Sequence, residues 1–347
     1  MKLSKKSPLK LTIQIPGILI LVVIILSTMP VLAQESTTVL ILTMEGPLTP
    51  AMSEYLDRGI TTAAQKGYQL IILELNTPGG SVTQMQEMVS QIRGSGVPIV
   101  IYIAPRGAIA GSAGTVVTLA GHRAAMAPET AIGAASPVGM GGEDLGETVR
   151  SKTEEIIKAQ IRSLASRRGA EAVAFAEQTV ETAKAASADE ALEVGLIDFI
   201  AEDVLDLLDQ LDGERISIQS ATLTLNTRGV IPDRLQLSLI EQLLQLLTNP
   251  NIVFILITIG AQAILIELSN PGVWVPGFVG AVSLALAGYG LGILPVNWFG
   301  IIFLIIAFVL FALEIKAPTL GALTAAGVAS LITGALVLFN SPGTPGF

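Results

Sequence analysis

From Asn251 to Phe347 the chain carries only three charged residues, Glu267, Glu314 and Lys316. A soluble domain of this length needs many more charges on its surface, whereas a lipid bilayer excludes them. Four apolar segments, at about 252–268, 274–294, 298–313 and 319–339, have lengths that suit membrane spans. The sequence therefore predicts an all-α transmembrane block of about four helices over residues 251–347.

This block contains an internal repeat. The set Glu267, Pro271 and Gly280 recurs at the same spacing as Glu314, Pro318 and Gly327. Two copies of a helical hairpin explain the repeat, with each glutamate at the end of a span, where water is within reach. We expect these carboxylates to act at the interface rather than as a proton site inside the membrane.

Residues 1–33 have the pattern of an export signal. Four lysines form a basic start, residues 11–26 form an apolar core, and Val31–Ala33 is a small-residue cleavage site. We expect cleavage after Ala33; because the apolar stretch is long, an uncleaved anchor is the alternative. The positive-inside rule places the lysines in the cytoplasm. The next region is therefore predicted to lie outside the cytoplasm, in a multi-pass protein of the cell membrane.

Between residues 34 and 202, short apolar runs alternate with amphipathic segments. Strands are predicted at 38–43, 70–75, 99–103 and 124–126, and helices at 50–65, 81–93 and about 147–168. This alternation is typical of βαβ units, so we predict an α/β domain with a parallel sheet. Residues 203–250 are predicted to be a connector. Helical spacing over 235–247 fits an amphipathic helix at the membrane or a helix packed on the soluble domain.

Composition argues against several classes of function. The net charge of −9 comes without a basic patch, so we expect no nucleic-acid partner. The chain has no cysteine, which excludes disulfides and thiolate metal sites, and we expect neither a metal nor a cofactor. The single histidine is His122. It lies about one helix length further along the chain than Ser112, the candidate nucleophile described in the next paragraph. We expect it near the opposite end of the sheet, with a structural role.

Ser112 is a candidate nucleophile because it lies among small residues, at 107–115, between an apolar strand and a helix. There it would face the N–H groups of a helix N-terminus, and its neighbours would let a substrate approach closely. The alternative is that Ser112 only caps the helix. A second turn, Asn76–Ser81, follows the preceding strand. If the two strands are neighbours, an N–H group of Gly79 or Gly80 and that of Ala113 converge beside Ser112 as an oxyanion hole.

A serine nucleophile needs a base. A lysine can serve when burial lowers its pKa, and the soluble region offers Lys66, Lys152, Lys158 and Lys184. Lys152 and Lys158 flank the apolar stripe of one predicted helix on opposite sides. Helical periodicity therefore does not choose between these two lysines.

Three motifs, in the order in which they occur, resemble the Clp protease and signal peptide peptidase A superfamily. They are Thr77–Gly80, Ala110–Gly114 and Ala188–Asp198. This resemblance implies a Clp protease/crotonase-like fold. With an export signal in front and membrane hairpins behind, the chain is most similar to the long, membrane-bound serine protease form of the NfeD family. The histidine of Clp protease is missing at the matching place, Ala135–Pro137. The resemblance instead implies a Ser/Lys dyad of Ser112 and Lys152, because Lys152 precedes the run Ile161–Ala165 by the family's spacing.

The resemblance further implies a membrane-anchored serine endopeptidase that cleaves hydrophobic segments of membrane proteins. It also implies a stomatin-like partner, contact with membrane lipid and assembly as a dimer or larger homo-oligomer. One alternative is a catalytically silent scaffold that binds stomatin-like proteins. Another is a crotonase-type acyl-CoA enzyme, against which stand the export signal and the lack of a carboxylate pair near the two turns. Long family members usually continue into a small β-barrel of OB type, which we expect to be absent here.

Overall fold

The computed structural model describes residues 38–137, 146–218, 221–270, 272, 274–294, 296–317 and 319–339. The predicted export signal at 1–33 lies outside the described residues, as do Pro271 and Pro318 of the repeat.

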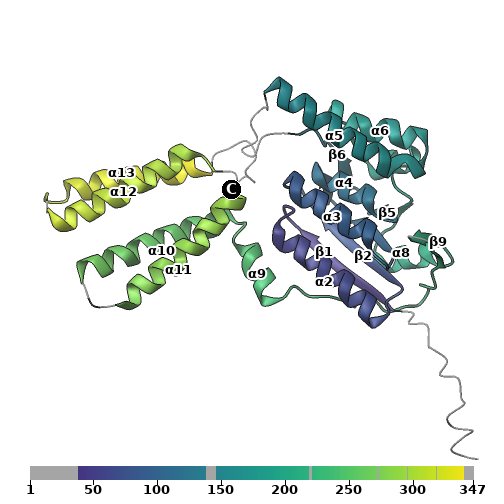
Figure 1. The fold of residues 1–347 in the computed structure, drawn as a ribbon, viewed down its shortest axis with the longest axis horizontal. Helices are drawn as coiled ribbons and strands as arrows, with labels where there is room; N and C mark the ends of the chain where they lie inside the picture. The colour runs from purple at the N-terminus through teal and green to yellow at the C-terminus, as the bar shows by residue number, and fades with distance from the viewer. Residues whose placement is uncertain are drawn as a thin grey trace, which may run out of the picture. The chain divides into compact units, whose positions relative to one another are not determined.

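A six-stranded parallel sheet forms the centre of the soluble domain (Figure 1). Its order is β11-β1-β2-β3-β5-β8, and every neighbouring pair is parallel. The strands are β1 (Val39–Glu45), β2 (Leu70–Asn76), β3 (Ile99–Ile103), β5 (Arg123–Met126), β8 (Phe199–Ile200) and β11 (Asp233–Arg234). The predicted α/β fold with a parallel sheet is thus confirmed.

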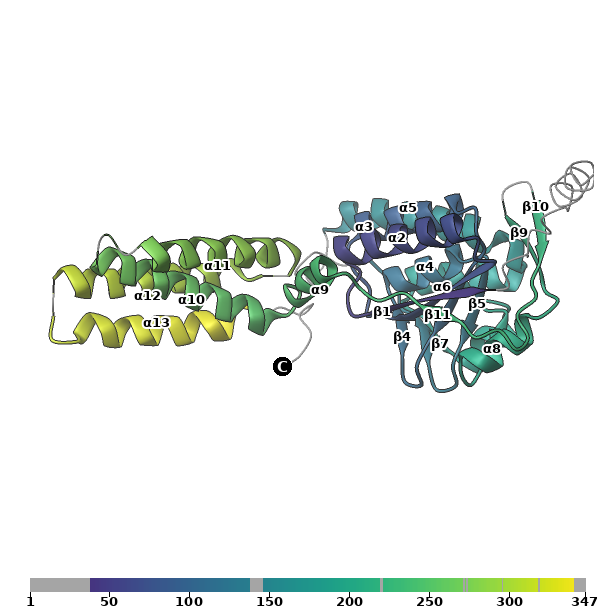
Figure 2. The same ribbon diagram turned by 90° about the horizontal axis from the view of Figure 1, so that it is seen from below.

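Helices cover both faces of the sheet, so its strands are apolar on both sides. Leu40 and Leu42 belong to the core beneath α2 (Pro50–Lys66), α3 (Val82–Gly94) and α4 (Ala113–Ala120). Val39 and Ile41 face the other way, into the core with α8 (Val204–Leu211). Figure 2 shows α2, α3 and α4 on one side of the sheet and α8 on the other. Helices α5 (Glu147–Ala165), α6 (Ala170–Glu181) and α7 (Ala188–Glu193) contribute buried residues to the first of these cores, and a 3₁₀ turn (Ser166–Arg168) separates α5 from α6.

Two small sheets were not predicted. Strands β4 (Ile109–Gly111), β6 (Ala131–Gly133) and β7 (Ala185–Ser187) form one of them, and β4 leads directly into the candidate nucleophile. Strands β9 (Arg215–Ile218) and β10 (Ala221–Thr224) form an antiparallel pair. Each strand has only three or four residues.

Residues 203–250 are more than the predicted connector. They supply α8, the β9–β10 pair, β11 and α9 (Leu239–Leu246). β11 extends the main sheet because Asp233 and Arg234 pair with Leu40 and Ile41 of β1. Most of this segment therefore belongs to the soluble domain.

Four apolar helices follow: α10 (Pro250–Ser269), α11 (Trp274–Ile293), α12 (Trp298–Lys316) and α13 (Ala322–Leu338). The first three are long and apolar enough to cross a membrane, and α13 is shorter, with 17 residues. Helix α10 packs with α11, and α12 with α13, as expected for repeated hairpins. The Glu314 carboxylate accepts hydrogen bonds from the N–H groups of Thr319, Gly321 and Leu323, so it holds the second hairpin's turn.

Candidate active site

Ser112 has a backbone conformation that is unusual for a residue with a side chain. Its φ is 51° and its ψ is −119°, a combination that costs energy and clusters at functional sites. Although it occupies the N-cap position of α4, its side chain makes no capping hydrogen bond, so the structure does not support the capping alternative. Its N–H donates to the carbonyl oxygens of Gly133 and Ala134, each at 3.2 Å. Among the described residues, the Ser112 hydroxyl has no hydrogen-bond partner and remains available for chemistry.

The turn after β2 lies directly against Ser112, as predicted from the two sequence turns. The Thr77 N–H donates to Ile109 O at 2.7 Å, and the Gly111 N–H donates to Thr77 O at 2.9 Å. A Cβ atom added at Gly79 would lie 2.7 Å from Ser112 Cβ and 3.2 Å from Ser112 Oγ. Only glycine fits there, and its φ of +121° also favours glycine. The carboxyl edge of the sheet therefore brings the two turns together.

The N–H groups near Ser112 are not equally available to a substrate. The Gly79 N–H donates to Thr77 Oγ1 at 3.0 Å, so it is already occupied. Within the described ranges, the N–H groups of Gly80 and Ala113 have no acceptor. The sequence did not reveal that Thr77 holds this turn. The sequence signal for this role is the threonine two residues before Gly79, because threonine hydroxyls commonly form hydrogen bonds with the backbone of their own turn.

The lysines of the soluble domain differ in their surroundings. Lys158 on α5 forms ion pairs with Glu155, at 2.9 Å, and with Glu181 of α6. The hydrogen bonds that Lys158 donates, the one to Glu181 foremost, raise its pKa. Lys184 donates to Gln178 Oε1 at 2.8 Å. Lys152 is exposed on α5 and makes no ion pair with any described residue. The structure does not bring its Nζ into hydrogen-bond contact with Ser112 Oγ.

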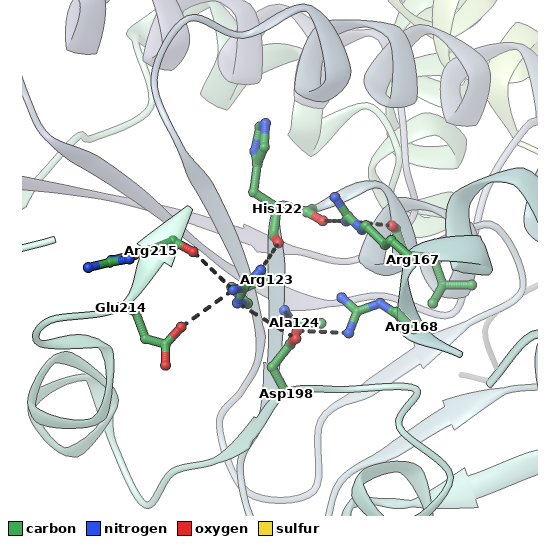
Figure 3. A network of polar contacts seen from close by, with 10 residues as sticks. His122, Arg123, Ala124, Arg167, Arg168, Asp198, Glu214 and Arg215 are labelled. Carbon is green, nitrogen blue, oxygen red and sulfur yellow. Dashed lines mark hydrogen bonds and ion pairs between the residues drawn. The ribbon is translucent and has the colours of Figure 1, made fainter. Parts of the chain in front are cut away.

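A polar network at the other edge of the sheet fixes how α5 runs along α4 (Figure 3). Arg167, just after α5, donates to the carbonyls of Leu119 and Gly121 at the C-terminal end of α4. Asp198 Oδ2 accepts from the Arg168 guanidinium at 2.8 Å and also from the N–H of Ala124. Because α4 and α5 pack together and end on the same side, the N-terminal half of α5 extends toward the Ser112 end of α4.

His122 lies far from the nucleophile, as predicted. It is buried at the start of β5, and its Nδ1 accepts a hydrogen bond from the N–H of Ile99 at 3.1 Å. Ile99 begins β3, so this contact lies at the amino edge of the sheet, whereas Ser112 lies at the carboxyl edge. Burial, helped by the nearby charge of Arg93, lowers the pKa of His122 to about 4. His122 therefore has a structural role.

We expect His122 to make the stability of the soluble domain depend on pH. An unfolded histidine has a pKa of about 6.5, so the unfolded chain binds a proton that the native chain, with a His122 pKa of about 4, excludes. The contribution of neutral His122 to the free energy of unfolding is complete above about pH 6.5. Up to about 3 kcal/mol of it is lost as the pH falls toward 4.

The check is the unfolding temperature of the detergent-solubilised chain at pH 7 and pH 4.5. His122→Asn, which keeps an acceptor for the Ile99 N–H but cannot titrate, should lose less stability on acidification than the wild type. Equal losses in both chains would contradict the assignment.

No group of three or more His, Asp or Glu side chains that could hold a metal ion is found in the described part of the chain.

Comparison with known families gives two matches. The NfeD integral membrane domain matches residues 251–346, and the N-terminal domain of NfeD1b matches residues 38–221. A membrane-bound protease of Pyrococcus horikoshii is 35% identical over 327 residues, which cover 93% of this chain and 73% of that protein. The membrane protein NfeD1b of Bacillus subtilis is 29% identical over 268 residues, which cover 74% of this chain and 56% of that protein.

Solved structures match the soluble domain. A lysine-to-alanine variant of a membrane-bound stomatin-specific protease, in complex with a substrate peptide, is 33% identical with a TM-score of 0.55; the match covers 59% of this chain and 95% of that one. A Pyrococcus horikoshii membrane protease specific for a stomatin homolog is 32% identical with a TM-score of 0.53, covering 61% and 98%. Together these matches support a membrane protease.

Proposed function

This chain belongs to the NfeD family, and we propose that it is a serine endopeptidase in which Ser112 is the nucleophile and Lys152 the general base. The observation that carries the proposal is the strained turn at Ser112, whose hydroxyl makes no hydrogen bond to a described residue and lies 3.2 Å from where a Cβ at Gly79 would be. The choice of Lys152 is supported by the ion pairs that hold Lys158 and by the direction of α5.

In this mechanism, neutral Lys152 accepts the hydroxyl proton of Ser112, and Oγ attacks the scissile carbonyl carbon. The N–H groups of Gly80 and Ala113 stabilise the resulting oxyanion, while Gly79 provides space beside the nucleophile. Protonated Lys152 then gives its proton to the leaving amine. Water, deprotonated by the same lysine, hydrolyses the acyl ester and frees Ser112. In structures without substrate, the hydrogen bond between a nucleophile and its general base is commonly long, and it shortens when substrate binds.

The proposed substrates are hydrophobic segments of membrane proteins, with a stomatin-like protein as partner. The solved relatives are proteases specific for stomatin or a stomatin homolog, and the proposal extends that partner to this chain. We also propose cleavage of the export signal, an extracytoplasmic soluble domain, the transmembrane block over residues 251–347 and assembly as a homo-oligomer. The scaffold alternative shares the fold but needs no reactive serine.

The test is cleavage of a panel of apolar peptides by the full-length chain in detergent micelles. Ser112→Ala should abolish cleavage, because the acyl-enzyme of this mechanism forms on the Ser112 Oγ. Ser136→Ala is the matched control, since its hydroxyl is bonded to Val180 O and plays no part in the mechanism. Cleavage that survives Ser112→Ala would disprove the mechanism. Binding of a stomatin-like protein, with no cleavage by any variant, would favour the scaffold.

A further inference from the structure

Helix α9 is fixed to the soluble domain along one side. Glu241 is buried, with its side chain 6% exposed, and accepts hydrogen bonds from the Arg58 guanidinium of α2 at 2.9 and 2.6 Å. Burial acts to raise the pKa of Glu241, but the bonds from Arg58 and Ser238 outweigh it and lower the pKa, which keeps the carboxylate charged. Gln245 donates to the carbonyl of Glu45 at 3.1 Å. The side of α9 that bears these groups is therefore held in place.

The other side of α9 is apolar and exposed. Four large side chains lie there without cover: Leu239 (84% exposed), Ile240 (69%), Leu243 (46%) and Leu246 (54%). At helical spacing they form one continuous stripe rather than scattered single residues. A contiguous apolar stripe of this kind marks a surface that contacts something other than water.

The connection to α10 determines what covers this stripe. Only residues 247–249 separate the end of α9 from the start of α10 at Pro250. Even fully extended, they reach about 10 Å. Helix α10 is long and apolar enough to span a bilayer, so its first residue lies near the membrane surface. The C-terminal end of the stripe, at Leu246, therefore lies within about 10 Å of the membrane surface.

We propose that α9 is an interfacial helix, with its apolar stripe in the boundary between the lipid headgroups and the acyl chains. The Arg58–Glu241 pair then couples this helix to the soluble domain. Glu45 is the last residue of β1, so α9 lies at the carboxyl edge of the sheet, the edge that carries Ser112. The contact with lipid would thus hold this edge of the domain near the membrane. The proposal depends on membrane attachment and not on the chemistry of Ser112.

The natural absence of cysteine makes a direct test simple. Single cysteines at Ile240 (Ile240→Cys) and, as a control, at Gln65 (Gln65→Cys) would carry an environment-sensitive fluorophore. Gln65 is exposed near the far end of α2, away from α9. The full-length chain would be reconstituted in phosphatidylcholine vesicles. We expect blue-shifted emission at position 240, quenched by nitroxide-labelled lipids and protected from iodide; the Gln65 site should be quenched by iodide alone.

Two outcomes would overturn the proposal. One is equal iodide quenching at both positions without quenching by labelled lipids. The other is protection at position 240 that depends on protein density and not on labelled lipid, which would assign the stripe to a second copy of the chain. Repeating the measurement in the Ser112→Ala background should change nothing. The outcome of this test is therefore independent of the proposed peptidase activity.

Discussion

Replacing Lys152 with alanine should lower peptide cleavage by about three orders of magnitude or more, while Lys158→Ala should leave it close to the wild-type rate. The two residues share a helix and a charge, so each is a matched control for the other. Removing Lys152 leaves Ser112 without a base. Removing Lys158 only breaks surface ion pairs with Glu155 and Glu181, whose contribution to stability is small.

The measurement is the initial cleavage rate of one apolar peptide by full-length variants, with the unfolding temperature recorded for each. Lys152→Arg sharpens the comparison, because it keeps the positive charge but cannot act as a base near neutral pH. Full activity in Lys152→Ala, or loss of activity only in Lys158→Ala, would contradict the dyad.

Adding a side chain at position 79 should lower the cleavage rate by about two to three orders of magnitude. In Gly79→Ala the new Cβ would lie 2.7 Å from Ser112 Cβ, closer than real Cβ contacts allow, at a φ of +121°. The nucleophile or the turn that carries the Gly80 N–H must then move. Because catalytic rate falls steeply with small displacements of reacting groups, activity should fall much more than stability.

The control for backbone strain is Gly169→Ala, at a φ of +104° with no atom within 4 Å of the added Cβ. It should show the stability loss of a strained alanine but keep its cleavage rate. If Gly79→Ala fails to fold, Thr77→Val tests the same turn. It removes the hydroxyl bonded to the Gly79 N–H and keeps the shape of the side chain, whereas Thr77→Ser keeps the hydroxyl. Normal cleavage by Thr77→Val would show that this turn does not serve catalysis.

The main sheet could be predicted because its strands are buried on both faces and therefore read as continuous apolar runs, such as Leu70–Leu73 and Ile99–Ile103. The small sheet of β4, β6 and β7 could not. Each of these strands has three residues, rich in alanine and glycine, and forms only through pairing with distant segments. β11 consists of Asp233 and Arg234, which carry no apolar signal at all.

The candidate active site, like the fold, has parts that could be predicted from the sequence and parts that could not. The two turns that carry Ser112 and the glycines at 79 and 80 could be predicted because turn chemistry is local. The roles of Thr77 and of the Gly133 and Ala134 carbonyls could not, because they depend on segments that meet only in the folded chain. Periodicity could not separate Lys152 from Lys158, since the ion pair that engages Lys158 involves Glu181 on another helix.

The position of β11 has a consequence for the order in which the chain folds. The strand pairs beside β1, and next to it the Tyr55 hydroxyl donates to Leu235 O across 180 residues of sequence. Contacts that close such long loops form late, after the local βαβ units have assembled. During synthesis the sheet cannot receive its last strand until the segment just before α10 has been made. Completion of the soluble domain is thereby tied to the synthesis of the segment that leads into α10.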